Sequence, residues 1–197
     1  MDFNKIAEKI TVFNQVLNKF NYGILIDNKI VIGDDIDFDD YVTISPKDFI
    51  KYKVGVCWDY AEFEALAFEK MFPEVQYQLY YIEGNNAGNS HTWLSFFLKD
   101  KWFTFESSWK SQQGILEFIS ETDMIDYYIK LFTKDFNLQR CAVYKYDPIR
   151  KYGLTPDEFM KEIFTNGELI INIGSYYEDV IKPWEDSGFT DMSSYEE

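Results

Sequence analysis

The fold of this chain is decided by residues 55–71, GVCWDYAEFEALAFEKM. Apolar side chains occur on most sides of this stretch, which predicts a central buried helix from Cys57 to Met71, ending before Pro73. The hydrophobic period then changes, and three stretches predict strands of an antiparallel sheet: residues 76–83, 91–98 and 102–107. The order of helix and sequential strands favours an α+β domain in which the helix packs on the sheet.

The flanking sequence adds elements on both sides of this centre. Apolar steps of three and four predict helices, and alternation predicts strands. Before the centre we expect a helix over 2–21, a hairpin over 24–32 and a short helix capped by Ser45. After it we expect a helix containing Phe118, Ile119 and Phe132, a strand over 141–146 and a helix opened by the capping box at Thr155. Accordingly we predict one domain: an N-terminal elaboration (1–50), a catalytic core (51–110) and a frayed tail (about 185–197).

Composition limits the classes of function. The 197 residues include 34 acidic and 19 basic side chains, a net charge of −15, and 46% of them are hydrophobic, with 19% aromatic. This apolar content excludes disorder for most of the chain. The charge disfavours nucleic acids and anionic membranes as partners and favours neutral or basic peptides. No apolar run suits a membrane span or a signal peptide. We therefore expect a cytoplasmic protein, whose oligomeric state the sequence leaves open.

Two residues are candidates for chemistry because their residue types are rare in this chain and because of where they stand. His91 is the only histidine, and Cys57 stands at the start of the predicted central helix. The first-turn N–H groups and the helix dipole favour a thiolate there, and can stabilise the oxyanion formed when a thiolate adds to an acyl carbon. Such a thiolate needs a base, which His91 can supply at the start of its strand. Cys57 could equally be an ordinary buried cysteine, as we expect for Cys141 in its alternating strand.

An acidic partner for His91 follows from strand parity. A two-residue turn at Lys99-Asp100 places residue 106 opposite Trp93, so that His91 and Glu106 become diagonal neighbours on one face. Diagonal Cα atoms lie about 7–8 Å apart, within reach of long side chains. A carboxylate on the second ring nitrogen orients a histidine base, and Glu106 is therefore the candidate.

Three motifs in this order resemble the transglutaminase-like superfamily. They are Gly55-Val56-Cys57-Trp58-Asp59-Tyr60-Ala61, Ser90-His91-Thr92-Trp93 and Trp102-Phe103-Thr104-Phe105-Glu106. The resemblance covers about residues 50–110 and implies a papain-like core: a helix carrying the cysteine, packed on an antiparallel sheet. It also implies a catalytic triad of Cys57 as nucleophile, His91 as base and Glu106 as orienting acid. Glu106 stands where the family usually has Asp.

The leading hypothesis is therefore a thiol-dependent acyl-transfer enzyme, a cysteine peptidase or amidase that forms a thioester on Cys57. Hydrolysis is preferred over transamidation, and the substrate is a peptide or protein amide. The alternative is a non-catalytic relative that binds a peptide through an aromatic groove. Trp58, Trp93 and Tyr52 are the candidates for lining a substrate groove. Lys51 and Tyr52 precede Cys57 at about the right distance for a second oxyanion donor, but neither is a convincing candidate.

No cofactor or metal is expected. The acidic run Asp35-x-Asp37-x-Asp39 imitates a calcium loop, but its sixth position is Asp40 instead of Gly and its twelfth is Pro46 instead of Glu. We interpret it as a solvated acidic loop. One histidine and two distant cysteines do not make a usual zinc site.

Overall fold

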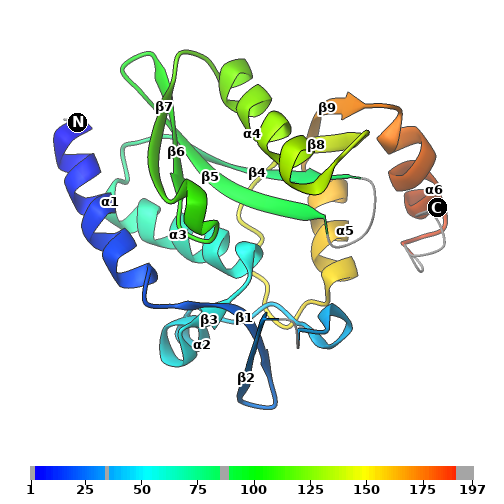
Figure 1. Cartoon of the computed structure of the whole chain (residues 1–197), viewed down its shortest axis with the longest axis horizontal. Helices are drawn as coiled ribbons and strands as arrows, with labels where there is room; N and C mark the ends of the chain where they lie inside the picture. Colours follow the sequence, from blue (N-terminus) through cyan, green and yellow to red (C-terminus); the bar gives the residue numbers. More distant parts are fainter. Residues whose placement is uncertain (1–2, 34–35, 85–88, 190–197) are drawn as a thin grey trace.

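The computed structural model describes residues 3–33, 36–84 and 89–189 and has a mixed α+β fold (Figure 1). Its centre is an antiparallel six-stranded sheet in the order β7-β6-β5-β4-β8-β9. The strands are β4 (Tyr77–Glu83), β5 (Ser90–Leu98), β6 (Lys101–Glu106), β7 (Gly114–Phe118), β8 (Cys141–Tyr146) and β9 (Glu168–Ile173). The α+β class and the antiparallel sheet predicted from the sequence are thereby confirmed.

Helices cover both faces of this sheet. Those of the N-terminal half are α1 (Phe3–Leu17), α2 (Pro46–Tyr52) and α3 (Cys57–Met71). Those of the C-terminal half are α4 (Glu121–Phe136), α5 (Pro156–Asn166) and α6 (Lys182–Asp186). Figure 1 shows α3 and α4 on opposite sides of the sheet. Alternation along β4 divides the core accordingly: Leu79 and Tyr81 pack in the cluster that contains α3, while Tyr80 and Ile82 pack with α4.

A second, three-stranded sheet lies at the start of α3. It has the order β2-β1-β3, with β1 (Asn21–Ile26), β2 (Lys29–Ile32) and β3 (Val54–Gly55). The hairpin between β1 and β2 turns at Asp27 and Asn28, both with positive φ, as in the tight turns that suit hairpins. β1 runs parallel to β3, with Tyr22 opposite Gly55. This pairing places Tyr22, from the N-terminal segment, beside Gly55, which stands two residues before Cys57.

Several boundaries agree with the sequence prediction. α3 spans Cys57–Met71, and the Ser45 hydroxyl caps α2 by accepting from the Asp48 amide at 3.2 Å. Leu98 pairs with Lys101, which confirms a two-residue turn at Lys99-Asp100. Both turn residues have positive φ, 52° and 60°. This turn sets the register on which the argument for Glu106 depended.

Two regions differ from the prediction. Phe118 ends strand β7, which the sequence analysis missed, so the expected helix begins only at Glu121, after its cap Ser120. The C-terminal segment also holds more structure than expected: β9, a π-helical turn η4 (Tyr177–Ile181) and α6. The first residues of the predicted frayed tail are packed, since the Phe189 ring lies 4.9 Å from the ring of buried Trp184. Residues 190–197 lie outside the described residues.

Within the described residues, no helix is long and apolar enough to cross a membrane.

Candidate active site

Cys57 occupies the first position of α3 because its neighbours hold the helix start in place. The Asp59 carboxylate accepts hydrogen bonds from the backbone N–H of Val56 and of Ile44, each at 3.0 Å. Burial raises the pKa of Asp59 to about 7, while those two N–H donors lower it. A Cβ on Gly55 would lie 2.7 Å from the Phe49 ring and 2.8 Å from the Asp59 Cβ. Only glycine therefore allows the chain to approach the helix so closely at this point.

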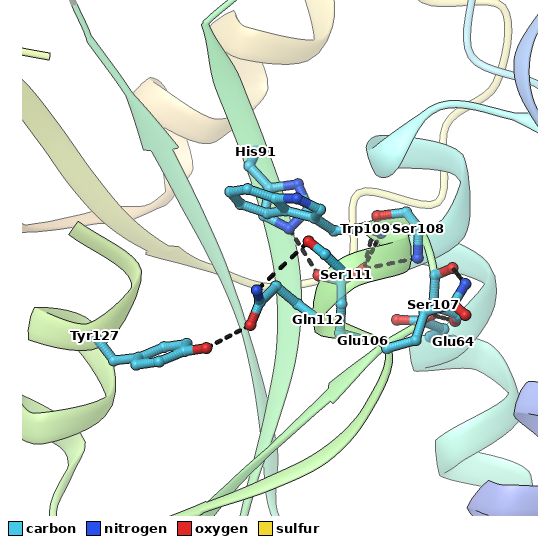
Figure 2. A network of polar contacts seen from close by, with 10 residues as sticks. Glu64, His91, Glu106, Ser107, Ser108, Trp109, Ser111, Gln112 and Tyr127 are labelled. Atoms are coloured by element: carbon cyan, nitrogen blue, oxygen red, sulfur yellow. Dashed lines mark hydrogen bonds and ion pairs between the residues drawn. The ribbon is translucent and has the colours of Figure 1, made fainter. Parts of the chain in front are cut away.

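His91 and Glu106 form a direct ion pair. His91 Nε2 lies 2.7 Å from Glu106 Oε2, and both side chains are buried (Figure 2). Their strands pair in the predicted register, with Leu94 opposite Phe105. The contact uses Nε2 of the imidazole, which leaves Nδ1 for a second partner.

The second oxygen of Glu106 is held by the turn that follows β6. Glu106 Oε1 accepts from the Ser108 N–H and hydroxyl, each at 2.7 Å, and from the Trp109 N–H at 2.9 Å. Figure 2 shows these donors gathered on one side of the carboxylate. Both oxygens of the carboxylate thus accept hydrogen bonds, and its longer side chain still meets the imidazole. A glutamate can therefore take the orienting position in this chain.

A second buried carboxyl lies behind the first. Glu64 of α3 accepts a hydrogen bond from the Ser107 hydroxyl. Burial and the negative charge of Glu106 raise the pKa of Glu64 well above its ordinary value. This shift favours the neutral form of Glu64, whereas the lowered pKa of Glu106 favours its carboxylate.

The electrostatics favour a charged imidazole that interacts with Cys57. Burial on its own lowers the pKa of His91, but the Glu106 charge and hydrogen bonds to Glu106 and Cys57 outweigh it and raise the pKa to about 10. Burial conversely raises the pKa of Glu106, but the His91 charge and the hydrogen bonds from the following turn bring it below its usual range. His91 therefore forms an ion pair with Glu106 and interacts electrostatically with Cys57, so that the three predicted residues lie in one site.

Aromatic rings surround the imidazole. The Trp109 ring meets it edge-on with centroids 5.0 Å apart, and the rings of Trp93, Tyr128 and Phe132 lie within 6.4 Å. This surrounding excludes water from most of the ring, and His91 is 5% exposed. Charges in such an environment interact more strongly than in water.

A cavity of about 380 Å³ opens beside His91, which we call the aromatic cavity. It is lined by Tyr22, Phe38, Ser90, His91, Ser108, Trp109, Lys110, Phe132 and Phe136. Three of its aromatic residues are 41–44% exposed: Tyr22, Phe38 and Phe136. Its size and apolar lining suit a small-molecule or side-chain site. Phe38 belongs to the short helix η2 (Phe38–Asp40), so the acidic segment reaches this cavity.

The residues expected to line a groove lie elsewhere. Trp58 is 7% exposed and stacks on Phe159, and Trp93 is 1% exposed and stacks on Tyr128. The Tyr52 hydroxyl contacts the side chain of Asn28. None of the three lines the aromatic cavity, and both tryptophans are core residues. The sequence analysis missed Tyr22 and Phe136, which do line it, because their position depends on contacts between distant segments.

The described residues contain no group of three or more His, Cys, Asp or Glu side chains that could hold a metal ion. In the acidic run, Asp37 caps η2 by accepting from the Asp39 N–H at 3.1 Å. Asp35 lies outside the described residues.

Comparison with known proteins adds no assignment. The chain matches no protein-family model, and a search of curated proteins found no match.

Proposed function

We propose that this protein is a thiol-dependent acyl-transfer enzyme that hydrolyses an amide or peptide bond through a thioester on Cys57. The observation that carries the proposal is the buried His91–Glu106 ion pair, with His91 interacting with Cys57 at the start of α3. A thiolate, a charged imidazole and an orienting carboxylate are the parts that such chemistry needs.

Each part has a defined task. The Cys57 thiolate attacks the carbonyl carbon and forms a C–S bond, while the carbonyl π electrons move to oxygen. When the tetrahedral intermediate collapses, the C–N bond breaks and His91 gives its proton to the departing amine. Water, deprotonated by His91, then attacks the thioester and releases the acid and the thiol. Transamidation would follow the same course with an amine in place of water.

The fold supports the resemblance seen in the three motifs. Cys57 begins a helix that packs on an antiparallel sheet, and His91 and Glu106 lie on adjacent strands of that sheet. We therefore propose a transglutaminase-like, papain-like core. Two local features would adapt this core to the present chain. Gly55 allows the close approach of the backbone before Cys57, and the Ser107–Trp109 turn supplies hydrogen-bond donors to Glu106.

The aromatic cavity is the proposed site for the substrate. It shares His91 with the triad, and its rings would bury an aromatic or large apolar group next to the scissile amide. Half-exposed Phe38 and Phe136 would lose contact with water when such a group binds.

The alternative, a peptide-binding module without catalysis, is favoured by one observation: Cys57 is only 5% exposed. A binding module needs an accessible cavity and does not need a reachable thiol. The reactivity of Cys57 therefore separates the two functions.

The test is the rate of iodoacetamide alkylation against pH, with each modified cysteine located by mass spectrometry. Wild type, Cys141→Ala and His91→Ala would be compared. We expect Cys57 to react at pH 6 in the wild type and in Cys141→Ala, and to lose that reactivity in His91→Ala, because the imidazolium stabilises the thiolate. A slow reaction of Cys57 that is independent of His91 would overturn the enzymatic proposal and favour the binding module.

A further inference from the structure

An enzyme that forms an oxyanion at Cys57 needs donors directed at that oxygen. The start of α3 supplies one, the backbone N–H of Cys57 itself. A lone donor leaves much of the developing charge uncompensated in a site that excludes water. A second donor should therefore lie within reach of Cys57 and open to the substrate cavity.

Tyr22 meets these requirements through the small sheet. Parallel pairing of β1 with β3 places it opposite Gly55, two residues before Cys57. Its hydroxyl lies close enough to Cys57 for the Cys57 side chain to raise, and the Cys57 backbone N–H to lower, the pKa of Tyr22. The residue also lines the aromatic cavity together with His91. Although 41% of Tyr22 is exposed, burial is the largest cause that raises the pKa of its hydroxyl.

The phenol keeps its proton in this position. Burial, and then the negative charge of Cys57, raise the pKa of Tyr22 well above its ordinary value. A phenol that stays neutral can donate its O–H to a negative oxygen without losing the proton.

We propose that Tyr22 is a catalytic residue, whose hydroxyl is the second hydrogen-bond donor to the oxyanion formed at Cys57. This inference rests on the proposed function. As the C–S bond forms and the carbonyl oxygen becomes negative, the Tyr22 O–H turns from the sulfur to that oxygen. The Cys57 N–H completes the pair of donors. The Tyr22 proton stays on its oxygen throughout, and the proton for the leaving group still comes from His91.

Two reactions of the same thiolate isolate this role. Acylation of Cys57 by p-nitrophenyl acetate passes through an oxyanion and releases p-nitrophenolate in a measurable burst. Alkylation by iodoacetamide displaces iodide at a saturated carbon and forms no oxyanion. In Tyr22→Phe the ring and the strand pairing remain and only the hydroxyl is lost. We expect acylation to slow by about 10²–10³-fold, as for loss of one oxyanion donor, while alkylation stays dependent on His91 and changes by less than about tenfold, because only the ground-state contact with the sulfur is lost.

The outcomes separate the inference from the function on which it rests. Alkylation of Cys57 that stays dependent on His91 in Tyr22→Phe shows that the variant is folded around its site. Tyr152→Phe, which alters an exposed tyrosine outside the cavity lining, should affect neither reaction. Equal or faster acylation in Tyr22→Phe, or an equal loss in both reactions, would overturn the role of Tyr22 alone. Failure of the wild-type Cys57 to become acylated would overturn the proposed function and this inference with it.

Discussion

The two cysteines of this chain are both buried, yet their surroundings differ completely. Cys57 is 5% exposed and Cys141 is 2% exposed. Cys141 lies in β8 within the apolar cluster beneath α4, where burial raises the pKa of its thiol to about 11. Cys57 begins a helix and interacts electrostatically with His91, whose pKa is raised by Glu106.

The comparison shows that exposure alone does not predict which thiol can react. Burial without charged partners favours the neutral thiol, whereas an imidazolium and a helix N-terminus favour the thiolate. A small probe or substrate must still reach the sulfur, and the aromatic cavity lies beside His91, the residue that interacts with Cys57. The predictions below test whether these neighbours, and not the fold in general, distinguish the two residues.

Replacing each cysteine separately by alanine should give the largest difference in reactivity between the two residues. In Cys57→Ala the p-nitrophenolate burst should disappear, because removing a nucleophile of this kind costs about 10⁶-fold in rate. In Cys141→Ala the burst should persist, with a loss of about 1 kcal/mol in the free energy of unfolding from the vacated core volume. Stopped-flow absorbance and urea denaturation measure the two effects. A burst that depends on Cys141 would reverse the comparison.

Glu106→Gln should reduce the difference between the cysteines by changing the charge of His91. Because His91 is the sole histidine, its ring signals in NMR titrate without overlap. In the wild type these signals should show that the ring stays protonated until the pH approaches its pKa of about 10. In the variant only burial and the contact with Cys57 remain, and the pKa should fall. The acylation rate should drop by up to about 10⁴-fold, as when an orienting Asp becomes Asn.

The same substitution has a defined effect on stability. The folded-state pKa of His91 is raised above the ordinary value of about 6.5, so the pair contributes stability that is fully present below pH 6.5. This contribution is lost as the pH rises through about 10. Wild type should therefore lose stability over this range, whereas Glu106→Gln should show a flatter profile. Parallel profiles would mean that the ion pair does not control the charge of His91.

Much of the candidate site around Cys57 could be predicted from local sequence. The helix start at Cys57 follows from Gly55 and the apolar run after it, and the approach of Glu106 to His91 follows from counting across a two-residue turn. These are short-range rules of helix period and strand parity. Tyr22 could not be placed in this way, since its position depends on a parallel pairing between segments more than 30 residues apart.

The elements that were missed have a similar explanation. β7 is a short strand between a turn and a helix, and its apolar residues merged with the helical pattern that follows. β9 is a nearly continuous apolar run without a clear period. Such runs gain their strand identity from a partner, here β6 and β8, and not from their own sequence.

Asp59→Asn should weaken the helix start that distinguishes Cys57. A carboxylate accepts from both the Ile44 and Val56 N–H groups, but an amide can accept from only one of them through its single oxygen. One buried N–H is left unpaired, at a cost of about 1–3 kcal/mol in the free energy of unfolding. Urea denaturation measures this loss. Exposed Asp126 in α4 is the matched control, and Asp126→Asn should change stability by less than about 0.5 kcal/mol.

Phe136→Ser should have the smallest effect and concerns substrate choice. Phe136 is 43% exposed at the end of α4 and lines the aromatic cavity. Losing its ring should slow acylation by p-nitrophenyl phenylacetate about tenfold, roughly 1.4 kcal/mol, because the aromatic acyl group loses part of its apolar contact. Acylation by p-nitrophenyl acetate should stay unchanged. Ile119→Ser, at a site that is 85% exposed and outside the cavity lining, should alter neither rate. An equal loss with both esters would mean that Phe136 supports the thiolate at Cys57 and does not contact the substrate.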